Sequence, residues 1–395
     1  MGTPSLSLPV SPEVARALWD QVAWVSRRAK ERRGLVYFPP TIGWDIPSFQ
    51  RPHHLARAFA IEGFAVVFDC RNARDPVFGF KEIEPDIFLF KGPAELLKEL
   101  PVTLVWCFVY NVLSRLEVTS ASLLVYDIID AFEMFPYERQ LLEKNHALAL
   151  KWADLVTCVS RELLQEVAEI RPDVVYLPNG VEAWRFDTQG VAMPEDPSLA
   201  PFFDAAAPDS PIAGYCGSLM WWFDYDLFLQ VTQLLPRWRF LIIGPQLDES
   251  ARHHPLFGQP NVFYIGPKPY PALPFYMQLY TVGVNPIGDR KVLRGLSPLK
   301  LYQNLAAGKP MVVTPFPEAQ GIPGVLMAES PASFAAALEK AADMARDPEF
   351  VAQLRRFAQR ESWLARVRTA LDYLEPSLAF AKPTQPPVRS AFPKP

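Results

Sequence analysis

Short apolar runs alternate with amphipathic stretches along the first half of the chain. The amphipathic stretches at residues 50–62, 136–151 and 161–170 have the spacing of helices. The apolar runs lie at residues 35–40, 64–69, 86–90, 103–108, 122–127, 155–158 and 174–177. Strands that are apolar throughout and separated by helices predict a parallel sheet covered on both faces.

The same alternation restarts after an irregular segment. Residues 187–211 are rich in Pro, Asp and Ala, which predicts an exposed connection between domains. Strands are then expected at 212–216, 239–244, 261–266, 281–286 and 310–314, and helices at 224–235, 298–308, 330–346 and 349–374. The fold class is therefore α/β, with two Rossmann-like domains at residues 1–186 and 212–375. A Pro-rich tail follows at 376–395, and its composition predicts disorder.

Residues 12–33 predict a helix with one apolar side and a basic end. Val14, Leu18, Trp19, Val22 and Val25 share the apolar side. The favoured interpretation is a helix packed on its own domain, with the cations compensating its C-terminal dipole. The alternative is peripheral association with an anionic membrane surface.

Length and composition support two domains and argue against a nucleic-acid partner. A chain of 395 residues exceeds what one core usually supports. Its 39 Lys and Arg residues against 43 Asp and Glu residues give a net charge of −4, so no general nucleic-acid-binding surface is expected. The N-terminus lacks a signal-peptide pattern, and no run of about 18 uncharged apolar residues is present. We expect a cytoplasmic protein, with the inner face of the membrane as the alternative.

The four cysteines are scattered and have no metal-ligand spacing. They are Cys70, Cys107, Cys158 and Cys216, each at or near the end of an apolar run. Buried free thiols in a reducing compartment are the expected state.

The most informative motif is SPLKLYQNLAAGKP at residues 297–310. In open parallel sheets, ligands bind at the carboxyl ends of strands, where helix N-termini offer free N–H groups to phosphates. Ser297 is expected as the N-cap and Pro298 as the first helical residue. Lys300 and Gln303 then share a face of the first turns, where a cation suits a diphosphate and an amide suits ribose hydroxyls. The alternative is that both are solvated helix residues.

This run resembles the nucleotide-binding segment of GT-B glycosyltransferases, which often reads S-P-x-K-x-x-E-Y-x-A-x-G-x-P-V-V. Further segments resemble the family in the same order, over about residues 35–375. They are residues 43–68, YDIIDAFEMFP (126–136), ADLVTCVSRELL (153–164), YLPNGVE (176–182), GYCGSLMWWFD (214–224), FLIIGP (240–245) and NVFYIGPKPYPALPFY (261–276). A shorter resemblance links Lys300 and Gln303 to the inverting glucuronosyltransferases of xanthan-type polysaccharide assembly.

The resemblance implies a role for each matching residue of the second domain. It implies that Gly217 and Ser218 approach the donor phosphates, and that Lys300 binds the diphosphate or the sugar. The segment IGPKPY would line the base pocket with Gly266, Lys268 and Tyr270.

One departure concerns a glutamate pair that retaining members often carry. The equivalent positions are Gly295 and Gln303, and neither is a carboxylate. Gln303 would take the ribose site, and a neutral hydrogen bond there would weaken donor binding rather than abolish it.

Two carboxylates of the first domain are candidates for a general base, Asp127 and Asp130. Both follow the strand at 122–127, where a side chain would face the donor across the cleft. Asp127 has a structural alternative as a cap of the following turn, so Asp130 is the freer candidate.

The acceptor side of the cleft is expected to use Trp44, Arg51, His53 and His54. These residues follow the loop after the first strand. For the two histidines, capping or packing of a helix start is the favoured alternative.

Two charged clusters in the second domain have weaker functional interpretations. Asp224 and Asp226 form a DxD string, but Asp224 suits a helix N-cap and no metal is expected. Arg290, Lys291 and Arg294 precede the 297–310 motif, and the arginines suggest a carboxylate on the donor sugar, as in UDP-glucuronate. Exposure of all three to solvent is the alternative.

These observations predict a glycosyltransferase that moves a sugar from a nucleotide diphosphate donor to an acceptor in envelope polysaccharide synthesis. The donor is expected to be UDP-linked and the acceptor a glycan or a lipid-linked glycan, without any further cofactor or metal. One alternative is a nucleotide-sugar 2-epimerase, which needs several carboxylates around the sugar. Another is a non-catalytic nucleotide-sugar-binding protein, suggested by the missing glutamate pair.

Overall fold

The computed structural model describes residues 10–46, 49–118, 122–186, 195–205 and 210–378. The strands of the first half are β1 (Leu35–Phe38), β2 (Ala65–Asp69), β3 (Gly79–Glu84), β4 (Ile87–Lys91), β5 (Val102–Cys107), β6 (Leu123–Ile128), β7 (Leu155–Cys158) and β8 (Val175–Tyr176). Those of the second half are β9 (Ile212–Cys216), β10 (Arg239–Ile243), β11 (Val262–Tyr264), β12 (Val282–Asn285), β13 (Met311–Val313) and β14 (Val325–Met327).

Helices surround both sheets. In the first half they are α1 (Pro12–Glu31), α2 (Arg51–Ile61), α3 (Glu95–Lys98), α4 (Arg139–Trp152) and α5 (Arg161–Ala168). The later ones are α6 (Ala200–Asp204), α7 (Tyr225–Leu234), α8 (Leu273–Met277), α9 (Arg290–Arg294), α10 (Leu299–Ala306), α11 (Pro331–Met344), α12 (Pro348–Arg360) and α13 (Trp363–Leu378). Because α12 and α13 are separate helices, the single helix expected at 349–374 is wrong.

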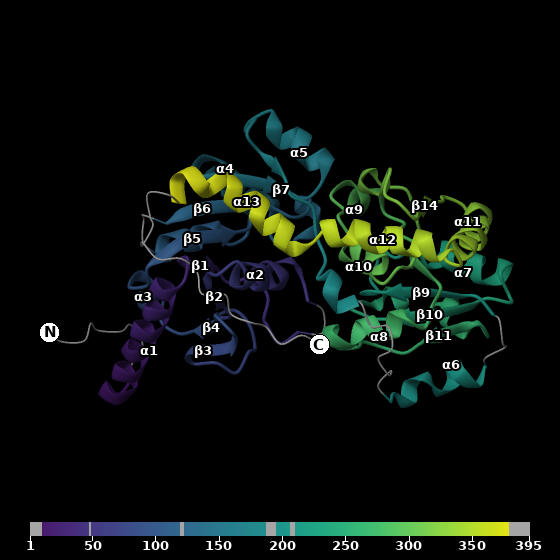
Figure 1. The fold of residues 1–395 in the computed structure, drawn as a ribbon, viewed down its shortest axis with the longest axis horizontal. Helices are drawn as coiled ribbons and strands as arrows, with labels where there is room; N and C mark the ends of the chain where they lie inside the picture. Colours follow the sequence, from purple (N-terminus) through teal and green to yellow (C-terminus); the bar gives the residue numbers. More distant parts are fainter. Residues whose placement is uncertain (1–9, 47–48, 119–121, 187–194, 206–209, 379–395) are drawn as a thin grey trace.

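Each half of the chain forms its own sheet, and the two halves lie side by side (Figure 1). The first sheet has the order β3-β4-β2-β1-β5-β6-β7-β8, and the second has the order β11-β10-β9-β12-β13-β14. All pairs are parallel except the β3–β4 hairpin, whose first strand the sequence pattern did not predict. The apolar strands are buried because helices cover both faces. The expected α/β architecture of two Rossmann-like domains is therefore confirmed.

Helix α1 packs on the first domain. Leu18, Val22 and Val25 are buried in the core beneath the sheet. At its basic end, Arg28 and Arg32 pair with Asp86 in the β3–β4 turn. The apolar side is thus used in the core, as the favoured interpretation expected. None of the helices in the described residues is long and apolar enough to cross a membrane.

Two segments pack elsewhere than the sequence suggested. Part of the expected exposed connection, residues 195–205, lies against the second domain, where Leu199 and Phe202 are buried. Helix α13 was expected in the second domain, but it crosses back and packs beside α2 on the first sheet (Figure 1). Trp363, Val367 and Leu371 complete the core of the first domain there.

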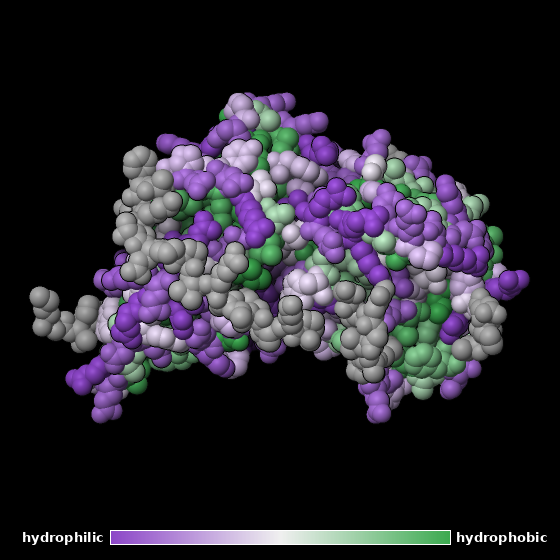
Figure 2. Space-filling model, viewed as in Figure 1, coloured by the Kyte–Doolittle hydropathy of each residue, from purple (hydrophilic) through white to green (hydrophobic). Residues whose placement is uncertain are grey.

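The chain passes between the domains at two adjacent points. Val181 bridges Ser362, so the first crossing lies against the second. A side chain at position 180 would come within 2.9 Å of the Trp363 backbone nitrogen, so this contact requires Gly180. On the face shown in Figure 2, the surface is mostly hydrophilic with scattered hydrophobic patches.

Candidate active site

A cleft with a volume of about 300 Å³ lies where the carboxyl ends of both sheets meet. The loops after β6, β9, β10 and β12 and the start of α10 contribute to its walls. The cleft lining includes Phe49, Gln50, Asp130, Met134, Asn179, Gly217, Ser218, Trp222, Gly244, Lys268, Tyr270, Ser297, Lys300 and Gln303. Binding at this edge is the general rule for open parallel sheets, so the cleft lies where a ligand was expected.

Lys300 brings a cation into the cleft from the first turn of α10. Its Nζ lies 3.4 Å from the Tyr215 hydroxyl and 4.8 Å from the centre of the Tyr215 ring. Burial lowers the pKa of Lys300 to about 8, so the amine is mostly protonated at pH 7. A helix start and a buried cation together favour an anionic ligand.

Glycines allow the backbone to approach Lys300. A side chain at Gly217 would come within 2.7 Å of Lys300 Cε, and one at Gly244 would lie 1.9 Å from the Gly217 oxygen. Gly217 and the adjacent Ser218 line the cleft, and a side chain at Gly217 would also lie 2.9 Å from the Lys300 amine. The loops after β9 and β10 therefore pack closely against each other beside the Lys300 cation.

Gln303 lies one turn further along α10 and lines the cleft with only 7% of its surface exposed. Ser297 also lines the cleft, but it is not the N-cap, because Pro298 holds that position without a side-chain cap. The Ser297 hydroxyl instead accepts a hydrogen bond from the Asn179 backbone N–H at 3.0 Å. Ser297 thus ties the start of α10 to the first crossing between the domains.

The two aspartates after β6 have different environments. Asp127 is buried and accepts two hydrogen bonds from Arg51, at 2.7 and 3.0 Å. Trp106 and Thr157 each donate a further bond at 2.8 Å. Both oxygens of the Asp127 carboxylate thus accept hydrogen bonds, and the residue does not line the cleft. Asp127 therefore has a structural role and is not a candidate for the general base.

Asp130 lies in the loop proper and lines the cleft. No hydrogen bond or ion pair to its carboxylate occurs among the described residues. Burial raises the pKa of Asp130 to about 7, and the Arg51 charge only partly opposes this effect. A carboxylate with this pKa changes protonation state near neutral pH, as a general base must.

The residues expected on the acceptor side pack beneath the cleft and do not line it. Arg51 holds Asp127, the Asn179 amide oxygen and the Leu177 carbonyl. His53 accepts a hydrogen bond from the Gln50 N–H at 3.1 Å, and its other nitrogen lies 2.8 Å from the Gly43 oxygen. Burial lowers the pKa of His53 to about 4, so the ring is neutral.

Trp44 and His54 are also structural. The Trp44 ring packs edge-on against Phe68, with ring centres 5.1 Å apart. His54 stacks on Trp363 at 5.1 Å, and burial lowers its pKa. The alternative of packing at a helix start, stated above for both histidines, is therefore the one that the structure favours.

The expected base-pocket residues divide into two groups. Lys268 and Tyr270 line the cleft, whereas Gly266, with φ +72°, forms the turn before them and is absent from the lining. Lys268 is paired with Asp196 at 2.6 Å. Tyr270 stacks on Phe49 of the first domain, with ring centres 5.2 Å apart and planes at 6°.

Arg294 points away from the cleft lining. It pairs with Glu162 at 2.9 Å and with Glu166, both on α5 of the first domain. Arg294 therefore joins the domains and does not line the donor site. The side chains of Arg290 and Lys291 lie outside the described part of the structure.

Comparison with known proteins adds family evidence to this geometry. Residues 210–343 match the family model described as Glycosyl transferases group 1. Similar solved structures include sucrose-phosphate synthase from Thermosynechococcus elongatus, with TM-score 0.62, 15% identity, and coverage of 88% of this chain and 100% of that one. Anabaena HepE in complex with UDP and glucose gives TM-score 0.60 and 12% identity, covering 86% of this chain and 99% of HepE. The protein has the GT-B fold.

A curated sequence relative of this GT-B protein is the putative teichuronic acid biosynthesis glycosyltransferase TuaH of Bacillus subtilis (strain 168). It is 27% identical over 247 residues. The match spans 60% of this chain and 60% of the relative.

The DxD string of the GT-B protein has a structural role at its first position. Asp224 caps α7 by accepting a hydrogen bond from the Leu227 N–H at 2.9 Å. Asp226 is 87% exposed and lies 3.3 Å from His254. Within the described residues, no group of three or more His, Cys, Asp or Glu side chains is arranged to hold a metal ion.

Chelators are expected to leave transfer unchanged, because neither aspartate lies in the cleft lining. The measurement is UDP release by protein pretreated with EDTA, with and without added magnesium. Loss of turnover that magnesium restores would contradict this expectation and would assign a metal-binding role to Asp224 and Asp226.

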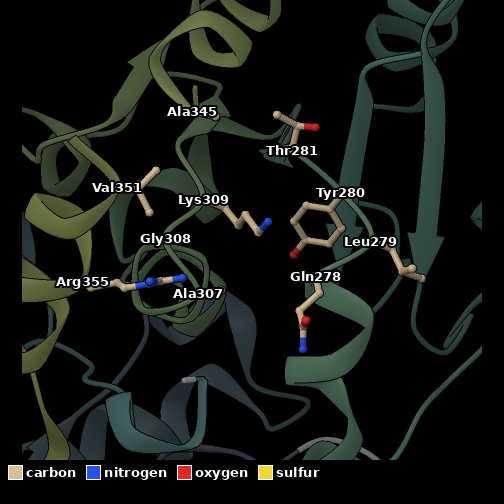
Figure 3. A pocket seen from close by; sticks show the side chains of 10 residues that line it. All are labelled: Gln278, Leu279, Tyr280, Thr281, Ala307, Gly308, Lys309, Ala345, Val351 and Arg355. Carbon is tan, nitrogen blue, oxygen red and sulfur yellow. The ribbon is translucent and has the colours of Figure 1, made fainter. Parts of the chain in front are cut away.

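A second pocket, of about 260 Å³, lies at the amino ends of strands β12 and β13, on the side of the second sheet opposite to the cleft (Figure 3). The C-terminal ends of α8, α10 and α11 reach it through Gln278, Ala307 and Ala345. Lys309 and Arg355 also line it, and burial lowers the pKa of Lys309 to about 8. Helix C-termini favour cations, so these two side chains compensate the dipoles there.

Sequence reasoning missed several residues of the GT-B cleft. Phe49, Gln50, Met134, Asn179 and Trp222 all line it. Each lies within or beside a segment that carries the family resemblance, but no spacing rule distinguishes a cleft residue from a packed one there. Only the fold brings Phe49 against Tyr270 and Asn179 against Ser297.

Proposed function

We propose that this protein transfers a sugar from a UDP-linked donor to a glycan or lipid-linked acceptor in envelope polysaccharide biosynthesis. The observation that carries the proposal is that Lys300 and Asp130, from different domains, line the same cleft. Lys300 and the start of α10 would hold the diphosphate. Asp130, from the opposite domain, would accept the proton of the acceptor hydroxyl. The name of the TuaH relative supports the biosynthetic setting.

The first experiment is a thermal-shift screen of nucleotides and nucleotide sugars. Selective binding raises stability by RT ln(1 + [L]/Kd), so UDP and UDP-sugars are expected to raise the Tm above ADP and GDP controls. UDP release from each stabilising donor is then measured with and without cell-envelope glycans. A protein that binds no uridine nucleotide and releases none would contradict the proposal.

The alternative of a 2-epimerase fits the cleft less well. Such a reaction needs several carboxylates around the sugar, and Asp130 is the one carboxylate in the described cleft lining. Donor incubated alone with the protein is expected to keep its sugar configuration, as followed by NMR.

For the donor sugar, we propose a neutral hexosyl group rather than glucuronate. Glucuronate was suggested by the Lys300/Gln303 pair and by three cations before it. Of these cations, Arg294 is already paired with Glu162 and Glu166, and the side chains of Arg290 and Lys291 lie outside the described residues. Lys268 is likewise paired with Asp196. UDP-glucose is therefore expected to bind at least as tightly as UDP-glucuronate by calorimetry. A preference for UDP-glucuronate of about tenfold or more, equal to about 1.4 kcal/mol, would restore the glucuronosyl assignment.

Gln303→Glu is expected to keep nucleotide binding and to tighten it by up to about fivefold. A carboxylate accepts a stronger hydrogen bond from a ribose hydroxyl than an amide oxygen does. The affinity for UDP is measured by calorimetry, with Gln359→Glu on the exposed side of α12 as the matched control. A clear loss of affinity in Gln303→Glu alone would remove Gln303 from the ribose site.

A further inference from the structure

Two consecutive tryptophans lie at the edge of the cleft on the loop between β9 and α7. Trp222 lines the cleft, and Trp221 beside it is 50% exposed. Their rings are 5.6 Å apart between centres, with planes at 73°. Neither the diphosphate nor the proton transfer proposed above needs an indole. An exposed indole gains little from folding, so the exposed Trp221 beside the cleft-lining Trp222 suggests a ligand at the cleft edge.

The loop that carries the pair is held by hydrogen bonds on both sides. The backbone N–H of Trp221 donates a hydrogen bond to the Asp248 carboxylate at 2.8 Å. The backbone carbonyl of Trp222 accepts one from the Gly288 N–H at 2.9 Å. The next residue, Phe223, is buried against Tyr215 with ring centres 4.8 Å apart. The two indoles are thus displayed on a fixed backbone, which lowers the entropy lost when a ligand binds.

We propose that Trp221 and Trp222 form a stacking platform for pyranose rings of the glycan acceptor. One face of a pyranose carries C–H groups that pack on an indole, while its hydroxyls stay hydrated at the rim. Trp222 faces the same cleft as Asp130, and Trp221 lies outside the lining. A glycan with its reacting hydroxyl at Asp130 would therefore pass over Trp222 and then Trp221. This inference rests on the proposed function, because it assigns the acceptor side of that cleft.

The charges around the pair favour a glycan over a membrane as its occupant. Asp226 and Glu249 are 87% and 74% exposed, and Asp248 binds the Trp221 backbone. Among the described side chains near the pair, the cation of Arg252 is already paired with Glu249. The side chains of Arg290 and Lys291, which follow Gly288 along the chain, lie outside the described part of the structure. An anionic lipid surface attracts clusters of Lys and Arg, and the described charged side chains of this rim are mainly carboxylates.

The test compares Trp221→Ala and Trp222→Ala with two further variants. Trp222→Tyr keeps an aromatic face, and Trp184→Ala removes a tryptophan that is 61% exposed outside the cleft lining. Binding of each protein to a printed array of bacterial surface polysaccharides is measured in the presence of UDP, and UDP affinity is measured separately by calorimetry. Each Trp→Ala change at the platform is expected to weaken glycan binding about tenfold, and UDP affinity is expected to stay constant in Trp221→Ala, which lies outside the cleft lining. Trp222→Tyr and Trp184→Ala are expected to retain glycan binding.

Four results would overturn the platform. The first two are that the wild-type protein binds no glycan on the array, or that glycan binding is unchanged in both alanine variants. The third is that Trp221→Ala lowers UDP affinity as much as it lowers glycan binding. The fourth is that the protein binds phosphatidylglycerol vesicles and that Trp221→Ala abolishes this binding. Failure of the proposed function gives a different result, because the wild-type protein would then bind no UDP while its glycan binding is still measured.

Discussion

Replacing Asp130 by Asn is expected to lower kcat by about 100-fold or more and to leave donor affinity unchanged. Removal of a general base typically costs a factor of 10² to 10⁴, and an amide of the same shape cannot accept the proton. Single-turnover transfer and calorimetric UDP binding measure the two quantities separately. A kcat within about threefold of the wild-type value would show that another group acts as the base.

The pH profile gives an independent check on Asp130. Its pKa of about 7 means that the active, ionised form is lost as the pH falls below 7. The wild-type rate should therefore drop about tenfold per pH unit below pH 6, and the residual rate of Asp130→Asn should not follow this slope.

Asp130→Asn is also not expected to unfold the protein. A raised carboxyl pKa means that the ionised form destabilises the folded state, and this cost is fully present above pH 7. The variant should thus have an equal or higher Tm at pH 8. A lower Tm there would attribute the loss of activity to misfolding.

Lys300→Met is expected to raise the Kd for UDP-sugars by about 10-fold to 150-fold, with a similar loss for UDP. The change removes a buried cation beside Gly217, and hydrogen bonds to charged groups are worth about 1.5–3 kcal/mol. Lys309→Met is the matched control. Lys309 is also a buried lysine with a pKa of about 8, but it lies near the amino ends of the strands of the same sheet, away from the cleft.

The two lysine variants should also differ in their pH dependence. Burial lowers the pKa of Lys300 to about 8, so donor affinity should fall as the pH rises through 8 and the amine loses its charge. Lys309→Met should keep this dependence, and Lys300→Met should lose it. Equal donor affinities for the two variants would remove Lys300 from the donor site.

The fold and the donor side of the cleft could be predicted because they depend on local patterns. Apolar strands separated by helices predict parallel sheets, and a loop that leads into a helix after β12 has its place determined by that topology. Lys300 and Gln303 follow from this placement. Ser297 was misassigned by one position, since its hydroxyl binds Asn179 of the crossing segment and Pro298 holds the N-cap position.

The acceptor side could not be predicted because its residues are selected by distant contacts. The sequence favours Asp130 over Asp127 as the free carboxylate, but it does not reveal what binds Asp127. Asp127 is occupied by Arg51, 76 residues earlier, and by Thr157, 30 residues later. His53 and His54 likewise pack against partners that only the folded chain brings near, including Trp363. Amphipathic spacing carries no information about such pairings.

The return of α13 to the first sheet affects the order in which the protein can fold during synthesis. The ribosome completes residues 35–177, which contain every strand of the first sheet, long before it reaches Trp363. Until then, the apolar side of that sheet lacks Trp363, Val367 and Leu371, which cover it in the finished molecule. The half of the protein that is made first is thus completed last, and its exposed apolar surface must be kept from aggregation while the second domain is being made.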